Sequence, residues 1–215
     1  MDYQNSLESI KNERMESAIE YASELFLLKG IENVKMTDIA KASGIGVASL
    51  YRYFVTKTSI VIRVGIYEWE KVRGLFDDIF HQAYYENKTG YEQISQLLSK
   101  QVVLFSEHKD FLRFLYEFDT YMIKEKVPKN ELAEYESSIM NIYPLFERAY
   151  AHGISDGTLR PDMDFKLVYK SLTHALMNLC QRFVLGEILP SDDFSTAEDE
   201  VKLIISMILE YIKSK

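Results

Sequence analysis

The chain has 215 residues, of which 47% are hydrophobic and 27% are charged, and this is the composition of a folded globular protein. Its single cysteine, Cys180, excludes a disulfide framework and a multi-cysteine zinc site, and neither a signal peptide nor a membrane-spanning run is found. We therefore expect a soluble, cytoplasmic protein, and the formal net charge of −8, taken whole, argues against nucleic acid as a partner.

Apolar residues recur at helical spacing along almost the whole chain, which contains only 9 Gly and 4 Pro. This pattern predicts an all-α fold of about nine long helices with short connections. The expected helices cover approximately residues 7–29, 37–44, 46–54, 57–87, 90–107, 110–126, 131–152, 164–186 and 195–213. Thr37 is the expected N-cap of the second helix, and the pattern Ser195-Thr196-Ala197-Glu198 predicts a capping box at the start of the last helix.

Residues 36–57 have the pattern of a helix-turn-helix, in which two short helices are joined by a tight turn. Such a unit buries one face of its second helix and presents the other face to a DNA major groove. Leu50 and Phe54 share one face of that helix, with Val47 close by. We expect this face to pack on the first two helices.

The side chains on the opposite face suit a major groove. Ala48 can meet a thymine methyl group, Ser49 can donate or accept a hydrogen bond, and Arg52 can reach O6 and N7 of guanine. Four further residues lie on the flanks, where phosphates are expected, and these are Thr37, Tyr51, Tyr53 and Lys57.

The distribution of charge agrees with a DNA-binding role for this segment. Residues 35–63 carry five cationic side chains and one acidic side chain, a local charge of +4. Residues 1–64 are neutral overall, so residues 65–215 account for the whole net charge of −8. The net charge points away from DNA, but its distribution points toward DNA binding by the N-terminal part of the chain.

These residues resemble the DNA-binding domain of the TetR (tetracycline-repressor-like) family of transcriptional regulators. The match covers roughly residues 10–65 and rests on Thr37-Asp38-Ile39-Ala40, on Ala42-Ser43-Gly44-Ile45, and on Leu50-Tyr51-Arg52-Tyr53-Phe54 followed by Lys57. Gly46 stands where the family usually has a serine or threonine N-cap. The resemblance implies that Thr37, Tyr51, Tyr53 and Lys57 contact the DNA backbone, and that the Val47-Ala48-Ser49 turn and Arg52 approach the bases. Gly46, at the start of that turn, is counted with the DNA-binding residues.

We divide the chain accordingly into a helix-turn-helix DNA-binding domain, residues 1–56, and a ligand-binding and dimerisation domain, residues 57–215. One helix-turn-helix reads only half a site, so two must lie about 34–36 Å apart, and this predicts a homodimer on a pseudo-palindromic operator. The expected interface is formed by the last two helices, as the resemblance also implies, and comprises Leu172, Leu176, Leu179, Phe183, Ile205, Ile208 and Ile212. Two alternatives remain: these stripes face only the internal core, or the chain dimerises through other surfaces.

The resemblance further implies a pocket for a small effector, whose binding shifts the long fourth helix and releases the operator, as in a repressor. The aromatic and methionine content of the middle of the chain favours an adaptable, largely apolar pocket. For each aromatic residue taken separately, packing in the core is the alternative role. The candidate lining residues are Tyr67, Phe105, Phe114, Phe118, Tyr121, Met122, Met140, Tyr143, His174, Met177 and Asn178.

No pattern of a catalytic, metal or cofactor site is found. The four histidines are scattered, and the chain has neither a phosphate-binding glycine loop nor a nucleophile elbow. Cys180 lies among apolar residues in a predicted helix, where an inert buried thiol is expected. We expect a regulator rather than an enzyme, without metal or cofactor. The alternatives are a helical adaptor or protein-binding module without sequence-specific DNA binding and, less favoured, a helical-bundle enzyme.

Overall fold

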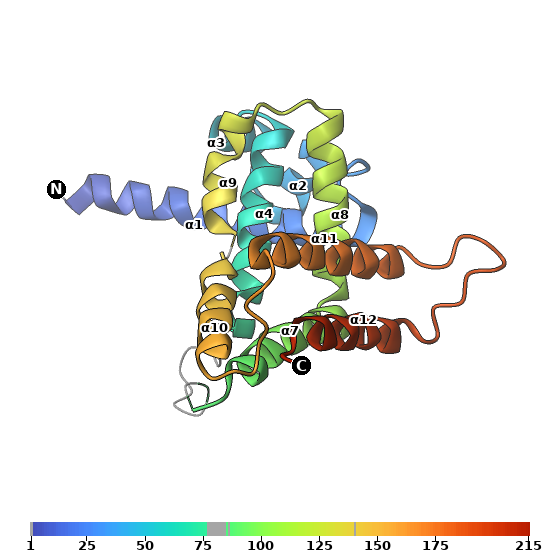
Figure 1. Ribbon diagram of the computed structural model, residues 1–215. Helices are drawn as coiled ribbons and strands as arrows, with labels where there is room; N and C mark the ends of the chain where they lie inside the picture. Colours follow the sequence, from blue (N-terminus) through green and yellow to red (C-terminus); the bar gives the residue numbers. More distant parts are fainter. Residues whose placement is uncertain (1, 77–84, 86, 140) are drawn as a thin grey trace. The chain divides into compact units, whose positions relative to one another are not determined.

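The computed structural model describes residues 2–76, 85, 87–139 and 141–215. This part of the chain contains ten α-helices, two short 3-10 helices and no β-strand, which confirms the predicted all-α fold (Figure 1). The α-helices are α1 (Asp2–Lys29), α2 (Met36–Ser43), α3 (Val47–Phe54), α4 (Lys57–Arg73), α7 (Gly90–Glu107), α8 (Lys109–Lys124), α9 (Ala133–Ser138), α10 (Tyr143–Ser155), α11 (Phe165–Val184) and α12 (Ala197–Ile212); the 3-10 helices are η1 (Gly74–Phe76) and η2 (Lys129–Leu132).

The chain forms two compact units, and each is described by itself. Unit 1 comprises Met1–Val72 and Arg113–Ile139. The three helices of the predicted DNA-binding domain, α1, α2 and α3, which we call the head, therefore share this unit with α4, most of α8, and α9. Unit 2 comprises Arg73–Leu112 and Met140–Lys215 and holds α7, α10, α11 and α12.

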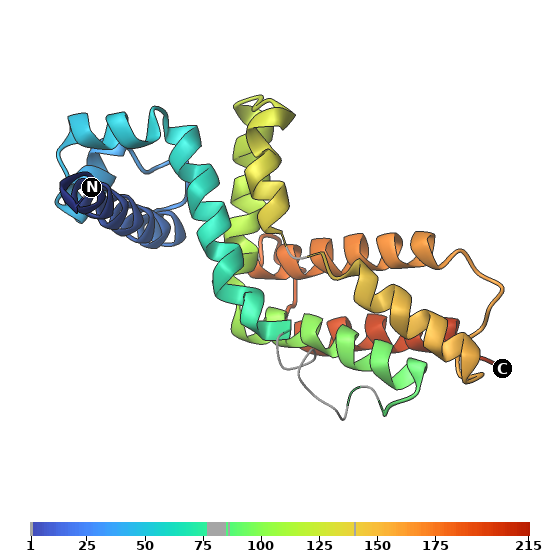
Figure 2. The same cartoon turned by 90° about the vertical axis from the view of Figure 1, so that its left-hand side faces the viewer.

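In unit 1, α1 packs against both α2 and α3 around a small apolar core (Figure 2). Ala22 and Phe26 of α1 are almost fully buried, and so are Leu50 and Phe54 of α3, as the helical spacing predicts. An isolated helix of eight residues is unstable in water, so α2 and α3 depend on this packing. Each large apolar side chain buried here contributes about 1.5–3 kcal/mol relative to exposure.

Two glycines end the first two helices. Gly30 follows α1 with a φ of +82°, and its N–H donates to the carbonyl of Phe26 at 2.8 Å. Gly44 closes α2 with a φ of +67°, a conformation that other residues rarely adopt. The predicted cap at Thr37 is wrong: the N-cap of α2 is Lys35, two residues before the expected one, and the helix begins at Met36. The reason is Asp38, whose carboxylate accepts the Lys35 N–H at 2.8 Å and fixes the start of the helix.

The predicted helix over residues 131–152 is broken in the structure. It is replaced by η2, the short helix α9, and α10, which carries Pro144 in its first turn. Proline has no N–H to donate and disfavours helical backbone in the residue before it, so it starts a helix more readily than it continues one. Pro144 marks this break in the sequence, but the apolar periodicity on either side of it predicts one continuous helix.

Two other helix ends differ from prediction. The long fourth helix was expected to reach residue 87, whereas α4 ends at Arg73 and continues as η1, and residues 77–84 and 86 lie outside the described residues. The capping box predicted at Ser195–Glu198 is wrong, because Thr196 is the N-cap and its hydroxyl donates to the carboxylate of Glu200 at 3.1 Å. The Thr196 side chain thus bonds another side chain rather than the helix backbone.

In unit 2, α11 and α12 run antiparallel side by side, and α7 contacts both α10 and α12 (Figures 1 and 2). The helices α7 and α10 cross closely at Gly90, which has no Cβ. A Cβ at this position would lie only 2.1 Å from the backbone nitrogen of Gly153. Asp156 fixes the same crossing by accepting the Gly90 N–H at 2.8 Å. After α12, Lys213 pairs with Leu159 in an isolated antiparallel bridge, which ties this end of unit 2 to the turn after α10.

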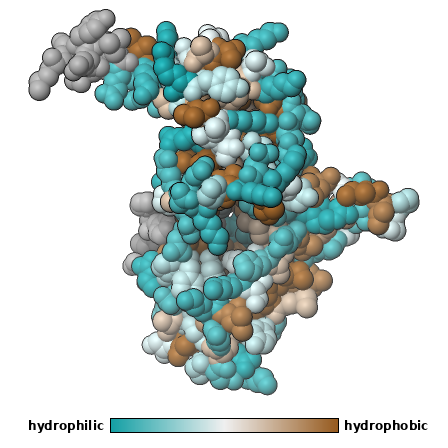
Figure 3. Space-filling model, turned by 90° about the horizontal axis from the view of Figure 1, so that it is seen from above, coloured by the Kyte–Doolittle hydropathy of each residue, from teal (hydrophilic) through white to brown (hydrophobic). Residues whose placement is uncertain are grey.

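Within the described ranges, no helix has both the length and the apolar character needed to cross a membrane. The face shown in Figure 3 is mostly hydrophilic, with apolar patches scattered between the polar side chains.

Candidate nucleic-acid interface

The helix α3 has one buried face and one open face, as the helix-turn-helix pattern predicts. Leu50 and Phe54 point into the core of unit 1, whereas Ala48 and Arg52 are exposed. Val47 was expected to pack near Leu50, but 40% of it is exposed. The open face is therefore more apolar than predicted, and it presents small or aliphatic side chains next to a single cation.

Arg52 is the central cation of this face. Its guanidinium lies 5.5 Å from the ring centroid of Tyr53 and 3.5 Å from the hydroxyl of Ser49, the limit for a hydrogen bond. The hydrogen bond from Arg52 lowers the pKa of Tyr53, and a second hydrogen bond from Arg14 lowers it further. Arg14 belongs to α1, and no pattern in the sequence indicates that it lies near α3. Arg14 is therefore a further cation close to Tyr53 at the predicted interface.

The remaining predicted contacts surround α3. Thr37 is exposed in the first turn of α2, and Tyr51 is 48% exposed on α3. Gly46 is the N-cap of α3, with extended backbone and no atoms within 4 Å of the position where a Cβ would lie. Thr56 caps α4, because its hydroxyl accepts the Ser59 N–H at 3.1 Å. Thr37 and Tyr51 are therefore open to a partner molecule, whereas Lys57 is more enclosed.

Lys57, the first residue of α4, is half-buried and its amine is engaged within unit 1. Nζ donates to the backbone carbonyl of Glu32 at 3.2 Å and lies 5.5 Å from the ring centroid of Tyr121. Burial of the amine lowers the pKa of Lys57, while the nearby carboxylates of Glu32 and Glu125 act in the opposite direction. This residue is both a predicted DNA contact and a contact of α8.

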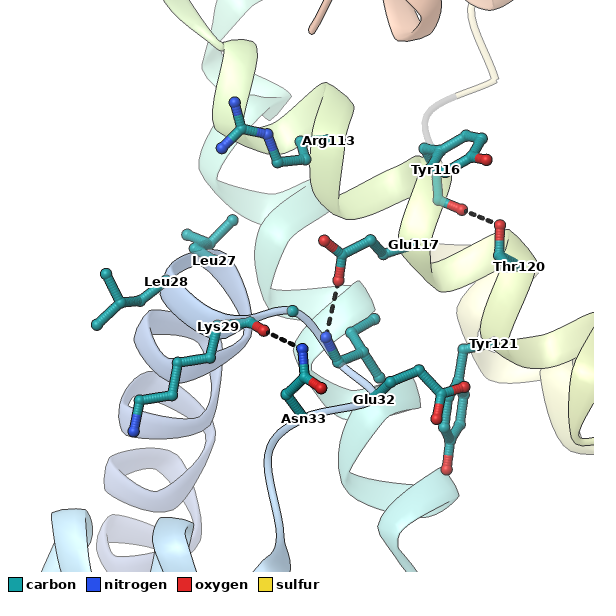
Figure 4. A pocket seen from close by; sticks show the side chains of 12 residues that line it. Leu27, Leu28, Lys29, Glu32, Asn33, Arg113, Tyr116, Glu117, Thr120 and Tyr121 are labelled. Carbon is teal, nitrogen blue, oxygen red and sulfur yellow. Dashed lines mark hydrogen bonds between the residues drawn. The ribbon is translucent and has the colours of Figure 1, made fainter. Parts of the chain in front are cut away.

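The helix α8 also contacts the turn that follows α1. A cleft of about 340 Å³ lies between them, and Glu117 reaches from α8 to the turn (Figure 4). The Glu117 carboxylate accepts the backbone N–H of Ile31 at 2.7 Å, and Lys124 forms an ion pair of 2.9 Å with Glu32. Gly30 permits this approach, since a Cβ there would lie 3.2 Å from the carboxylate.

A buried polar contact joins α1 to α4. Only 2% of Glu68 is exposed, and its carboxylate accepts hydrogen bonds from the hydroxyl of Ser23 at 2.5 Å and from Nζ of Lys71 at 2.9 Å. A buried carboxylate needs such partners, because the loss of hydration is otherwise uncompensated. The periodicity of α4 could not reveal this contact, since it depends on a residue 45 positions away.

The candidate effector residues divide between the two units. In unit 1, Tyr67 of α4 is half-buried, and α8 carries four buried candidates, which are Phe114, Phe118, Tyr121 and Met122. In unit 2, Phe105 is buried against Phe183, with ring centroids 5.8 Å apart. Met177 and Tyr143 are half-buried, His174 and Asn178 are exposed on α11, and Met140 lies outside the described residues. The side-chain amide of Asn178 donates to the carbonyl of His174 at 2.7 Å.

The candidate interface residues lie mostly inside unit 2. Leu172, Leu176, Ile205 and Ile212 are buried by the chain itself, and Leu179, Phe183 and Ile208 are half-buried. The large apolar side chains that α11 and α12 expose are Leu167, Leu203, Met207 and Tyr211. A strong apolar stripe marks the face toward the unit's own core, so sequence periodicity missed this second, weaker apolar face.

Cys180 is buried as expected, and burial raises the pKa of its thiol to about 11. Such a thiol is almost entirely protonated near neutral pH and is a poor nucleophile. Within the residues that the structure describes, no group of three or more His, Cys, Asp or Glu is arranged to hold a metal ion.

Comparison with known proteins gives the same picture of the head. Residues 18–64 match the family described as bacterial regulatory proteins, tetR family. The chain is 23% identical over 159 residues to the HTH-type transcriptional repressor KstR2 of Mycolicibacterium smegmatis, which covers 73% of each chain. It is 28% identical over 163 residues to the HTH-type transcriptional repressor KstR2 of Rhodococcus jostii. That alignment covers 75% of this chain and 76% of the relative.

A solved structure, that of the ketosteroid transcriptional regulator KstR2 of Mycobacterium tuberculosis, has the same fold, with a TM-score of 0.59 at 19% identity. The alignment covers 94% of this chain and 96% of that one. The family match spans α2, α3 and the residues that enclose their core. Residues 18–64 therefore resemble the DNA-binding part of the bacterial regulatory proteins of the tetR family, and the two-faced geometry of α3 agrees with this match.

Proposed function

We propose that this chain is a ligand-responsive transcriptional repressor, which binds a pseudo-palindromic operator as a homodimer and is released by a small, largely apolar effector. The observation that carries the proposal is the geometry of α3. Its apolar face closes the head core through Leu50 and Phe54, and its open face presents Val47, Ala48 and Arg52. A short helix with these two faces, following a tight turn, is the element that enters a major groove.

The chemistry of the open face favours a particular operator. Val47 and Ala48 offer apolar contact to thymine methyl groups, and Arg52 offers the paired donors that recognise guanine. Arg14, Tyr53 and Thr37 supply the surrounding contacts to phosphate. We therefore expect a half-site that places thymines beside a guanine.

The second copy in the proposed homodimer packs on the exposed sides of α11 and α12. Leu203 and Met207 lie one turn apart on α12, and each is 59% exposed. Exposed apolar side chains on adjacent helices are typical of an interaction surface. The buried residues Leu172 and Leu176 support the same surface from beneath, by fixing α11 in unit 2.

The effector class is inferred from α8 and from the relatives. Phe114, Phe118 and Met122 form a buried apolar face of α8 within unit 1, and an effector that binds among them must itself be largely apolar. One relative of known structure is described as a ketosteroid transcriptional regulator. We propose an effector with a large apolar framework, of the size of a steroid or a long acyl chain.

The test is fluorescence anisotropy with DNA from the region upstream of the protein's own gene, against a scrambled fragment, over a series of salt concentrations. Tight, salt-sensitive binding to one fragment supports the proposal. Arg52→Ala is expected to weaken specific binding by about 5- to 150-fold, which corresponds to about 1–3 kcal/mol. The matched control is Lys202→Ala, which removes one exposed cation from α12 and is expected to leave DNA binding unchanged.

The absence of any sequence-preferring, salt-sensitive complex contradicts the proposal and favours a helical adaptor that uses the head to bind protein. Turnover of a substrate by the purified protein favours the enzyme alternative instead.

A further inference from the structure

Lys57 is a predicted DNA contact whose side chain also contacts α8. It begins α4, directly after the turn that ends the proposed recognition helix, and it lies in the basic segment of the head. An extended lysine side chain at such a position reaches a phosphate as a flexible point charge. In the structure, however, the amine is turned toward α8 and is engaged there by the Glu32 carbonyl and the Tyr121 ring.

Both partners of the amine are held in place by further contacts. Tyr121 is only 5% exposed, and its hydroxyl lies 3.5 Å from the hydroxyl of Thr58. Glu32 is tied to α8 by its ion pair with Lys124. The site is therefore a cradle, formed by the backbone of Glu32 and the ring of Tyr121, whose shape depends on the position of α8 relative to the turn after α1 within unit 1.

The cradle competes with DNA for the same ammonium group. The amine is partly desolvated, and burial lowers its pKa. To meet a phosphate, Nζ must leave the Glu32 carbonyl and the face of the Tyr121 ring, and the loss of these contacts opposes the gain from the new one. A lysine held in this way contributes less to operator affinity than a lysine that is free at the surface.

We propose that Tyr121 and the Glu32 carbonyl restrain Lys57, so that the position of α8 controls one phosphate contact of the DNA-binding head. This inference rests on the proposed function and adds a mechanism to it. Phe114, Phe118 and Met122 lie on the same helix as Tyr121, so a ligand that displaces α8 acts on Lys57 without an intermediate element. Tyr121 is a positioning residue, and Lys57 is the group through which it acts.

The test compares Tyr121→Leu with Tyr121→Phe in two backgrounds, wild type and Lys57→Gln, by anisotropy with the operator fragment over a salt series. Leucine removes the aromatic face, and we expect operator affinity to rise about two- to fivefold. The slope of log affinity against log salt concentration is expected to steepen by about 0.9, the value for one added phosphate contact. Tyr121→Phe keeps the ring but loses the hydroxyl contact with Thr58, and we expect a smaller gain in affinity than Tyr121→Leu gives.

The Lys57→Gln background separates this mechanism from others. Restraint of Lys57 predicts that the gain from Tyr121→Leu disappears when residue 57 has no charge. An equal gain in the Lys57→Gln background overturns the inference, because Tyr121 then acts through another group. No gain in the wild-type background overturns it as well.

A second measurement uses the wild-type protein and holds even where Tyr121→Leu does not fold. The pKa of the Lys57 amine is followed by NMR with isotope-labelled lysine, the signal being assigned by its loss in Lys57→Gln. We expect the lowered pKa of the free protein to rise when the operator fragment binds, since the amine then exchanges its buried contacts for a phosphate. An operator complex in which this pKa is unchanged contradicts only the present inference, whereas a wild-type protein that binds no operator contradicts the proposed function.

Discussion

The aromatic rings of Phe118 and Tyr135 stack with centroids 4.3 Å apart, and both rings lie against Gly65 in the middle of α4. A Cβ on residue 65 would come within 2.8 Å of the Tyr135 ring and 2.9 Å of the Phe118 ring. The Tyr135 hydroxyl is fixed in addition by a hydrogen bond of 3.0 Å from Nε1 of Trp69. Glycine in a helix costs about 1 kcal/mol relative to alanine, and here its small size lets α8 and α9 approach α4 closely.

Gly65→Ala is expected to destabilise unit 1, although alanine is the better helix former. Overpacking typically costs about 1–3 kcal/mol and outweighs the gain of about 1 kcal/mol in helix propensity. The control is Gly74→Ala, where a Cβ meets no atom within 4 Å. Urea unfolding checks both variants. A Gly65→Ala protein as stable as the control would mean that the two rings move aside without cost.

Gly90→Ala is expected to be more severe, because the nearest atoms belong to the backbone. Its Cβ would lie 2.1 Å from the nitrogen of Gly153 and 2.4 Å from the carbonyl oxygen of Ala149. No side-chain rotation relieves such contacts, so α7 and α10 must separate, and we expect a loss of about 3 kcal/mol or more. Thermal unfolding followed by circular dichroism measures the effect, with Gly74→Ala again as the control. A loss no larger than that of Gly65→Ala contradicts this ranking.

Asp156 is expected to make the stability of unit 2 depend on acidic pH. Burial of Asp156 raises the pKa of its carboxyl group, but hydrogen bonds from Thr158 and from the Gly90 N–H outweigh this effect, and the pKa is lowered overall. The pKa in the folded state thus lies below the unfolded value of about 3.9. The stabilisation is therefore fully present above about pH 4 and is lost as the pH falls through the folded-state pKa.

Asp156→Asn tests this dependence, because it keeps the shape of the side chain and removes the charge. We expect a loss of about 1 kcal/mol at neutral pH, since the group is partly exposed, and a flatter stability profile below about pH 4. Asp199→Asn serves as the control, because the Asp199 side chain is 82% exposed on α12 and lies 4.0 Å from Lys202, the limit for an ion pair. Urea unfolding at several pH values gives both profiles. Equal profiles for Asp156→Asn and the wild type would exclude the proposed role of Asp156.

Leu203→Glu combined with Met207→Glu is expected to disrupt the proposed homodimer. Two carboxylates placed in an apolar interface lose hydration, and we expect dimer dissociation to become at least about tenfold easier, a change of about 1.4 kcal/mol. Analytical ultracentrifugation measures the change, and operator affinity is expected to fall with it. Leu28→Glu is the control, because Leu28 is a 78% exposed apolar residue in the last turn of α1, outside the proposed interface. A double variant that sediments as the wild type does would place the interface elsewhere.

The short-range patterns of the sequence determined the helices of the head and their two faces. Leu50 and Phe54 are four residues apart, so both fall on one side of α3 whatever surrounds it, and Gly30 and Gly44 end their helices because few other residues adopt a positive φ. Pro144 also indicates the start of a new helix, α10. The apolar pattern continues with helical spacing across this position, however, and so predicts a single helix.

Only the tertiary structure decided which polar groups meet across the chain. Lys57 looked like a simple phosphate contact, yet its amine is held by Glu32 and Tyr121, the second of which lies 64 positions further along the chain. Arg14 beside Tyr53 and Ser23 beside Glu68 are contacts of the same kind. Helix periodicity also did not identify the exposed residues Leu203 and Met207, because the stronger apolar stripe of α12 faces the core of unit 2. Helix periodicity depends on neighbours three or four residues apart, whereas these contacts depend on how whole helices pack.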